Sequence, residues 1–445
     1  MSVSPRSECL IRRAYRVSFA KNDFIPRLPG LLSLNDDALV QILSRLYGQD
    51  ALSFSLTSKR ASALGLARVG AVIQCNDCSH NLRPLHRFLL APLCGIPRAH
   101  YLESFQLDYD HKAGLEHLVV DILVEAENLR EFRMTRFDVC LSHDPRLGPA
   151  MCFIRKLTNL DLSVPNEAVC AILPSLRGSL HSVTLRYRHP YSTQQPEQQS
   201  FVSLSAVLSA HRDIHTVHIC HFIPQPESLH AGPITATEEP EFHSIRSLRL
   251  QACSILALKL VEMCPNLETL DIEDGLSTPE SSEDVIRHAL SRSWPPLHRL
   301  AFEIHHSTDL LRHIVPHLRP TSILEINDWL SVNGSRPFTH TNSAQFYTHV
   351  NSRVPDVTLR GAHDNSSYST LLRAAAPHAL VLRLRLSHGN PAGSPLWGEI
   401  TARVPQLRSL TLELEPDVLL SFELGFYGWP DGILVSTSHR VTALY

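Results

Sequence analysis

The sequence predicts an α/β solenoid, in which strand–loop–helix repeats stack into one curved parallel sheet with helices on its convex side, preceded by a small helical module. Three observations predict it. The pattern L-x-x-L-x-L returns twelve times between residues 102 and 412, at steps of 22 to 34 residues. Stretches with helical spacing lie between the copies, and a segment without a strand period precedes them. A repeat of this length is typical of a solenoid.

Each copy of the pattern is expected to contribute one strand, because its last two apolar positions alternate with polar ones. A single repeat does not fold alone, since a few buried side chains at about 1.5–3 kcal/mol each do not offset about 1–2 kcal/mol for every ordered residue. Stacked repeats shield one another, so the array folds together. The copies begin at Leu102, Leu129, Leu157, Leu180, Ile214, Ile245, Leu267, Leu297, Thr321, Val354, Val381 and Leu407.

Composition limits the possible classes of function. The 445 residues carry a net charge of −3, which gives no electrostatic reason to expect a nucleic-acid or membrane partner. No apolar run reaches 18 residues, so no membrane-spanning helix is expected. The ten cysteines are spread along the chain and no secretory signal peptide is found, which indicates a cytoplasmic or nuclear location, or both.

Motifs for catalysis and nucleotide binding are missing from the sequence: there is no G-x-x-x-x-G-K-[ST], G-x-G-x-x-G, H-E-x-x-H or G-x-S-x-G. We therefore expect a protein that is not an enzyme and has no cofactor. Cys75 and Cys78 have a spacing that suits zinc, with His80, His86 and Cys94 nearby. No second pair lies at a matching distance, and Cys75 also fits an inward strand position, so no metal site is predicted and zinc is the alternative.

The chain divides by pattern into five segments. A basic tail, a helical module, a transitional segment, the repeats and a C-terminal cap are expected at residues 1–27, 28–68, 69–101, 102–412 and 413–445. A mitochondrial presequence is the alternative for the tail. In the transitional segment, VIQC at 72–75 is expected as a first atypical strand and LHRFLLAPL at 85–93 as a helix. The cap is predicted around Phe422, Phe426, Tyr427 and Trp429.

The helical module is predicted to contain three short helices. In the first, Asn35 suits the N-cap, and four residues at i, i+3, i+4 and i+7 form one apolar face: Leu39, Ile42, Leu43 and Leu46. Asp50 is expected to cap a second helix that carries Leu52 and Leu56. A third helix is expected around Leu64 and Arg68. Three helices in so few residues bury little, so the module is expected to depend on the solenoid or on a partner.

The repeats resemble the leucine-rich repeat family in its irregular, intracellular form. The string LNDDALVQILSRLYGQDALSFSLTSKRASAL resembles the F-box, the helical motif that docks substrate receptors onto the Skp adaptor of cullin–RING ubiquitin ligases. It matches at Leu34, Ile42-Leu43-Ser44, Leu46, Asp50, Leu52 and Thr57-Ser58-Lys59-Arg60. It departs at Asn35, where proline is usual, and at Ala61, where tryptophan is frequent. The whole chain resembles the fungal type of F-box/leucine-rich-repeat protein.

This resemblance implies a non-catalytic substrate-recognition subunit of a Skp–cullin–F-box E3 ubiquitin ligase. Its partners would be a Skp-family adaptor, through it a cullin, and a target protein bound by the solenoid. The adaptor contacts implied are Leu34, Ile42, Leu43, Leu46, Leu52 and Lys59. The alternative is a leucine-rich-repeat scaffold unrelated to ubiquitin, whose N-terminal helices act only as a cap.

Two surfaces of the solenoid are candidates for binding the target. The polar sides of the strands carry an acidic stretch followed by a basic one, which would orient a charged partner; ordinary solvated strand residues are the alternative. These residues are Asp271, Glu273, Glu303 and Glu325, then Arg360, Arg383 and Arg385. The second surface is a rim of polar inserts at 187–200, 221–242, 273–284, 327–345 and 387–396, for which tolerated drift is the alternative.

Overall fold

The computed structural model divides the chain into two compact units, residues 1–69 and residues 70–445. We describe each unit by itself. The structure describes residues 34–43, 45–46, 48–76, 78–93, 95–109, 114–163, 166–187, 200–224, 240–277, 294–303, 320–327, 356–360, 379–386, 406–414, 433–437 and 440–444.

The described part of the first unit contains three helices, α2 (Asp36–Leu43), α3 (Gly48–Ser55) and α4 (Lys59–Val69). Its core consists of Leu39, Leu43, Phe54 and Ala61, with Leu46 and Leu64 packed against it. The predicted N-cap of α2 is confirmed, because the side-chain oxygen of Asn35 accepts a hydrogen bond from the backbone N–H of Ala38 at 2.8 Å.

The prediction for the start of the second helix was wrong by three residues, since an N-cap at Asp50 puts the first helical residue at 51. Helix α3 begins at Gly48, so Asp50 lies in its first turn rather than at its N-cap. A carboxylate in the first turn still faces the positive end of the helix dipole, which explains why an acidic residue suits either position. The predicted third helix is confirmed as α4, which contains Leu64 and Arg68.

The second unit is built on one 15-stranded sheet. Strands β1 and β4 to β15 follow in chain order, and each pairs with its neighbour in parallel. After β15 the direction changes, since β17 pairs with β15 and β16 pairs with β17 antiparallel. The bounds are β1 (Val72–Cys75), β4 (Ser104–Leu107), β5 (Glu131–Met134), β6 (Asn159–Ser163), β7 (Ser182–Arg186), β8 (Thr216–Cys220), β9 (Ser247–Ser254), β10 (Thr269–Ser277), β11 (Leu297–Glu303), β12 (Pro320–Asn327), β13 (Asp356–Arg360), β14 (Val381–Leu386), β15 (Ser409–Leu414), β16 (Ile433–Thr437) and β17 (Arg440–Leu444).

Each of the twelve sequence repeats contributes one strand of this sheet, from β4 to β15 in order. The α/β class and the long parallel sheet are therefore confirmed, as a repeat solenoid requires. The first atypical strand expected at VIQC is also confirmed as β1, which pairs with β4.

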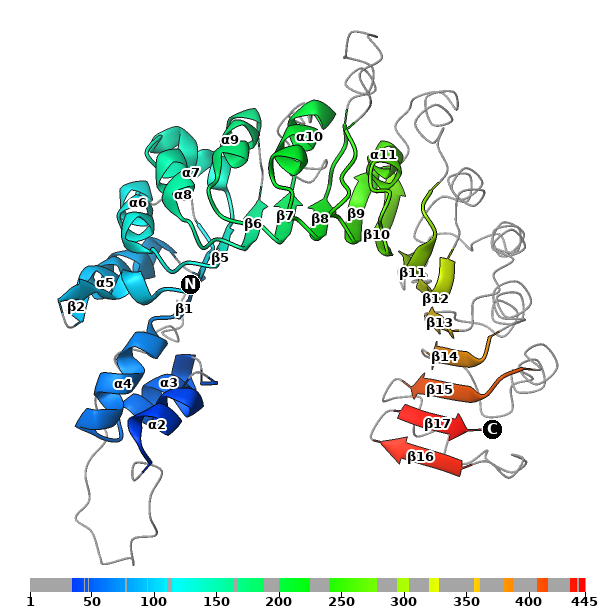
Figure 1. Ribbon diagram of the computed structural model, residues 1–445, viewed down its shortest axis with the longest axis horizontal. Coiled ribbons are helices and arrows are strands. Elements are labelled where there is room, and N and C mark those ends of the chain that lie inside the picture. Colours follow the sequence, from blue (N-terminus) through cyan, green and yellow to red (C-terminus); the bar gives the residue numbers. More distant parts are fainter. Residues whose placement is uncertain are drawn as a thin grey trace, which may run out of the picture. The chain divides into compact units, whose positions relative to one another are not determined.

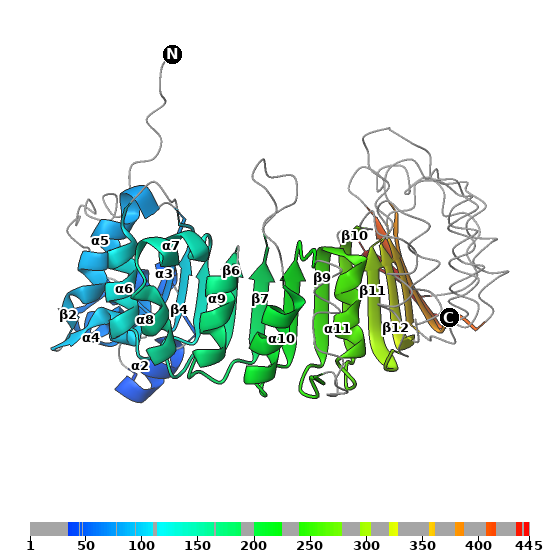
Figure 2. The same ribbon diagram turned by 90° about the horizontal axis from the view of Figure 1, so that it is seen from above.

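Helices of the second unit lie on one face of the sheet (Figures 1 and 2). The α-helices are α5 (Cys78–Leu90), α6 (Glu116–Glu125), α7 (Phe137–His143), α8 (Leu147–Phe153), α9 (Glu167–Ile172), α10 (Phe201–Ala210) and α11 (Lys259–Glu262). Three short 3₁₀ turns accompany them: η2 (Arg98–Tyr101), η3 (Leu173–Ser175) and η5 (Ile255–Leu258).

The helix expected at 85–93 differs from the prediction at both ends. Helix α5 begins at Cys78 and ends at Leu90, and Pro92–Leu93 forms a short strand, β2, that pairs with β3 (Ile96–Pro97). Proline has no N–H to donate to a preceding turn, so Pro92 does not continue the helix.

The core of this unit lies between the sheet and the helices. The strand anchors of the repeats point into it: Leu160 and Leu162 of β6 and Val183 and Leu185 of β7 are buried. Register places anchor beside anchor, with Leu160 opposite Val183 and Leu162 opposite Leu185. Apolar side chains therefore form continuous rows from strand to strand, and each repeat is stabilised by its neighbours.

Candidate interaction surfaces

The helical module exposes three large apolar side chains. Leu34, Val40 and Leu56 are 39%, 50% and 69% exposed. They make up three of the seven large apolar side chains that are exposed among the described residues. For a unit with so small a core this concentration is high, and exposed apolar patches are typical of interaction sites.

The adaptor contacts implied by the sequence resemblance lie at different depths in the module. Leu34 and Lys59 are exposed, Ile42 and Leu52 are half-buried, and Leu46 is half-buried against the core. Leu43 is buried within the module's own core. A substitution of Leu43 would therefore act first on the stability of the module.

Sequence reasoning missed Val40 and Leu56 as surface residues. The signal for Val40 was present, since it directly follows Leu39 and so lies off the inward stripe that Leu39 and Leu43 form one turn apart. Leu56 was expected to belong to the second helix, whereas α3 ends at Ser55.

An arginine holds the first and third helices of the module together. The Nε of Arg60 donates to Oδ1 of Asp36 at 2.8 Å, and its Nη2 donates to the backbone oxygen of Leu34 at 2.9 Å. Arg68 on the same helix donates from Nε to the backbone oxygen of Leu46 at 3.2 Å. These bonds fix the segments on either side of α2 and thereby position Leu34.

A second candidate surface is the face of the sheet that carries the polar strand residues, which we call the polar face. Register aligns several predicted target-binding residues on it. Asp271, Glu325 and Arg383 share one row across β10 to β14, with Ala301 and Thr358 between them. The next row contains Glu303, Asn327, Arg360 and Arg385 in successive strands.

Three acids of the acidic stretch, Asp271, Glu273 and Glu325, do not form an unbalanced negative patch, because arginines of neighbouring strands pair with their carboxylates. Arg299 of β11 lies 2.8 Å from Asp271 Oδ1 through Nη1 and 2.9 Å from Glu325 Oε2 through Nη2. Arg249 of β9 pairs with Glu273. Burial raises the pKa of Asp271 although Arg299 acts to lower it.

The basic stretch is also balanced in part. Arg383 lies 2.6 Å from Oδ1 of Asp356 on the neighbouring strand β13. Among the side chains that the structure describes, the polar face is therefore a series of ion pairs between adjacent strands rather than two blocks of opposite charge. Sequence reasoning missed Arg249, Arg299 and Asp356. Arg249 lies directly opposite Asp271 on the neighbouring strand, and Arg299 lies two residues before Ala301, which is opposite Asp271 on the other side. Both arginines are therefore on the same side of their strands as the predicted acids.

Further ion pairs lie earlier in the array. Asp161 of β6 accepts two hydrogen bonds from Arg186 of β7, both at 2.9 Å, and lies 3.4 Å from Arg133 Nε of β5. His218 of β8 follows, with its Nε2 3.2 Å from the sulfur of Cys220. Burial, then the charges of Arg249 and Arg186, lower the pKa of His218.

The His218–Cys220 pair does not have the properties of an activated nucleophile. Burial raises the pKa of the Cys220 thiol to about 11, and its side chain is buried. The thiolate is the reactive form of cysteine, and this environment disfavours it.

The described residues contain no group of three or more His, Cys, Asp or Glu side chains placed to hold a metal ion. Cys75 is buried in β1, and Cys78 begins α5. His86 lies 3.1 Å from Asp121 through Nε2. Cys94 lies outside the described residues.

Several predicted features fall on parts of the chain that the structure does not describe. They are the basic tail 1–27, most of the inserts of the predicted rim (188–199, 225–239, 278–284, 328–345 and 387–396) and the aromatic residues Phe422, Phe426, Tyr427 and Trp429. These stay predictions.

Within the described ranges, no helix combines the length and the apolar character that crossing a bilayer requires. Comparison of the sequence with models of known protein families and with curated proteins finds no match.

Proposed function

We propose that this chain is the non-catalytic substrate-recognition subunit of a Skp–cullin–F-box ubiquitin ligase. In this proposal the helical module binds a Skp-family adaptor, and the solenoid holds a target protein. The observation that carries it is the exposed apolar set Leu34, Val40 and Leu56, on a three-helix unit whose sequence resembles the F-box.

The exposed side chains supply a reason for the module to bind a partner. Fully burying a Val or Leu side chain contributes about 1.5–3 kcal/mol. Leu34, Val40 and Leu56 are exposed only in part, so covering each of them would add about 1 kcal/mol. Three such contacts correspond to about a hundredfold in affinity. The module itself gains as well, because its core of Leu39, Leu43, Phe54 and Ala61 is small.

In this proposal the solenoid binds the target protein and catalyses no reaction itself. Holding a target beside a conjugating enzyme raises the effective concentration of its lysines, and the ligase partners supply the reaction. The ion pairs of the polar face favour specificity over affinity, because a partner must replace contacts such as Arg299 with Asp271 and Glu325 by equally good ones.

The proposal is tested by titrating the purified full-length chain with a Skp-family adaptor in a calorimeter. We expect the double variant Val40→Asp/Leu56→Asp to weaken binding at least about 30-fold, since it removes two apolar contacts and buries charge. Both residues are exposed, so the variant keeps the helical circular dichroism of the wild type. Val202→Asp, at a 58% exposed valine of α10 in the second unit, is the matched control and leaves affinity unchanged.

Two results would overturn this proposal. If the wild-type chain does not bind the adaptor, the alternative of a repeat scaffold with capping helices is favoured. If it binds and the double variant binds equally well, the adaptor contacts lie elsewhere than on the exposed surface of α2 and α3.

A further inference from the structure

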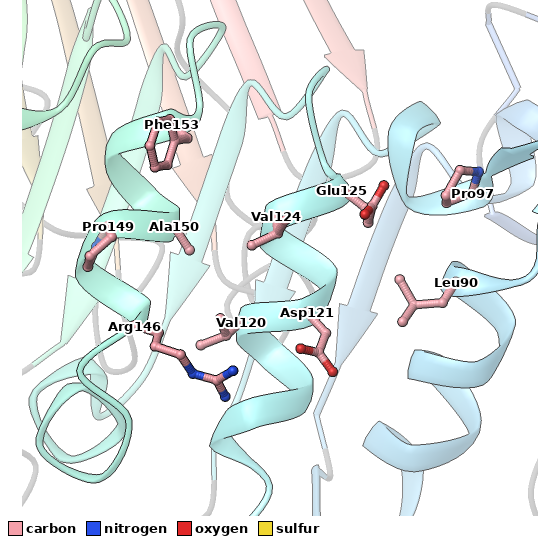
Figure 3. Close-up of a pocket in the computed structure, with 10 residues that line it drawn as sticks. All are labelled: Leu90, Pro97, Val120, Asp121, Val124, Glu125, Arg146, Pro149, Ala150 and Phe153. Carbon is pink, nitrogen blue, oxygen red and sulfur yellow. The ribbon is translucent and has the colours of Figure 1, made fainter.

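The helical side of the second unit contains a hollow over helix α6, with a volume of about 560 Å³. Helix α8 forms one wall, and the end of α5 together with Pro97 of β3 forms the other (Figure 3). The residues that line it include Val124, Phe153, Asp121, Glu125 and Arg146.

One side of this hollow is apolar and exposed. Val120 and Val124 point from α6 toward Pro149 and Ala150 of α8 in Figure 3. Val124 is 59% exposed and Phe153 is 65% exposed, although the Arg177 guanidinium lies 5.3 Å from the Phe153 ring centre. Most other large apolar side chains that the structure describes on these helices are buried, so an exposed apolar cluster is unusual in this layer.

The other side of the hollow is acidic. Asp121 and Glu125, one turn apart on α6, point toward α5 and Pro97 (Figure 3). Glu125 has no ion-pair partner among the residues that the structure describes, and Asp121 has only the ring of His86 at 3.1 Å. Arg146 on the opposite wall is held by both oxygens of Asp144, at 3.0 and 2.7 Å, and its charge also interacts with that of Asp121, which leaves Glu125 as the less compensated acid of the two.

Two features of the hollow indicate the kind of partner: the backbone hydrogen bonds of its walls, and its division into an apolar and an acidic side. The lining is mostly helical, and the N–H and C=O groups of α5, α6 and α8 are bonded internally; its one strand residue, Pro97 of β3, has no N–H to donate, so an added strand finds little to pair with. An α-helix docks through side chains alone, and helix α6, ten residues long, offers about 15 Å of floor. A helix with an apolar stripe beside lysine or arginine matches the apolar and acidic sides together.

We propose that this hollow binds an amphipathic helix of a partner protein. Its apolar stripe packs against Val124, Pro149 and Phe153, and its lysine or arginine side chains pair with Asp121 and Glu125. This inference is independent of the proposed ligase function, because it involves only α5, α6, α8 and β3 of the second unit.

The test uses the full-length chain and two synthetic, fluorescently labelled helical peptides of about 15 residues. The first carries leucines at every third or fourth position with lysines beside them, and its twin has glutamate in place of each lysine. Fluorescence anisotropy measures both affinities. We expect the lysine peptide to bind about tenfold more tightly than its twin, because only its charges complement Asp121 and Glu125.

Three variants locate the binding site. Val124→Ser and Phe153→Ser remove exposed apolar surface, and Glu125→Lys reverses a charge; each should weaken the lysine peptide about tenfold. Val202→Ser makes the same chemical change at a valine of equal exposure on α10 and should have no effect. Thermal unfolding checks that all four variants fold like the wild type.

The proposal is overturned if the lysine peptide does not bind at concentrations up to about 1 mM. It is also overturned if the two peptides bind equally, or if the three variants at the hollow bind the lysine peptide as well as Val202→Ser does.

Discussion

Arg299 holds two carboxylates from two different strands, and its removal gives a sharp test of the polar face. Its guanidinium lies within 2.9 Å of both Asp271 on β10 and Glu325 on β12. Arg299→Ala leaves these two acids facing each other across β11 without a cation between them. Burial already raises the pKa of Asp271, so its charge has little water to compensate for the lost partner.

The loss of stability expected for Arg299→Ala lies between two limits. An exposed ion pair contributes about 0.2–1 kcal/mol, and breaking a buried one costs about 3–5 kcal/mol. The Arg299 side chain is 31% exposed and has two partners, which are 20% and 18% exposed. We therefore expect Arg299→Ala to lower the free energy of local opening of β10 to β12 by about 2 kcal/mol.

Hydrogen exchange measured by mass spectrometry is the suitable assay, because a repeat array opens locally and its global unfolding need not be two-state. Amides of β10, β11 and β12 should exchange about 30-fold faster in the variant at 25 °C. Arg246→Ala is the control: Arg246 lies 3.4 Å from Glu268, and both side chains are at least half exposed. Its effect should stay below about 1 kcal/mol. Equal effects of the two substitutions would refute the reasoning.

The pH dependence of the variant has a definite sign. Without Arg299, the pKa of Asp271 rises further above that of the unfolded chain, so the folded state binds the proton more strongly. Stability lost at neutral pH is then recovered as the pH falls through the folded pKa. We expect the difference between Arg299→Ala and wild type to shrink on acidification from pH 7 to pH 5, measured by the same exchange experiment.

Three further predictions concern packing and reactivity. Leu162→Ala, at a fully buried anchor of β6, should destabilise β5 to β7 by about 3 kcal/mol in hydrogen exchange, and a loss below about 1 kcal/mol would contradict the predicted anchor role. Gly65→Leu should unfold the helical module in circular dichroism, because even a Cβ at this position would lie 2.1 Å from the Ser55 hydroxyl; an unchanged spectrum would contradict this packing. Cys220 should react with iodoacetamide at pH 7.5 at least about tenfold more slowly than free glutathione, as followed by mass spectrometry, since the pKa of its thiol is raised to about 11; an equal rate would contradict its burial.

The strands of the sheet were predictable because the alternation of apolar and polar residues that predicts each strand lies within a single repeat. Leu160 and Leu162, for example, alternate with Asn159 and Asp161 within a few residues, and this period alone determines which side chains are buried. The limits of the helices were less predictable. Asp50 suits both the N-cap and the first turn, so the local sequence does not decide where α3 begins.

The candidate surfaces were only partly predictable, because they depend on relations between repeats. Sequence alone places Asp271 and Glu325 on the polar side of their strands, but the register puts Ala301 between them and brings Arg299, two residues earlier on β11, within reach of both. The same holds for the hollow over α6. Val124 and Phe153 are apolar residues of α6 and α8, and only the packing of these helices shows that both stay exposed beside a hollow. A surface formed by lateral contacts therefore requires the structure, whereas the fold that carries it is already determined by the repeat.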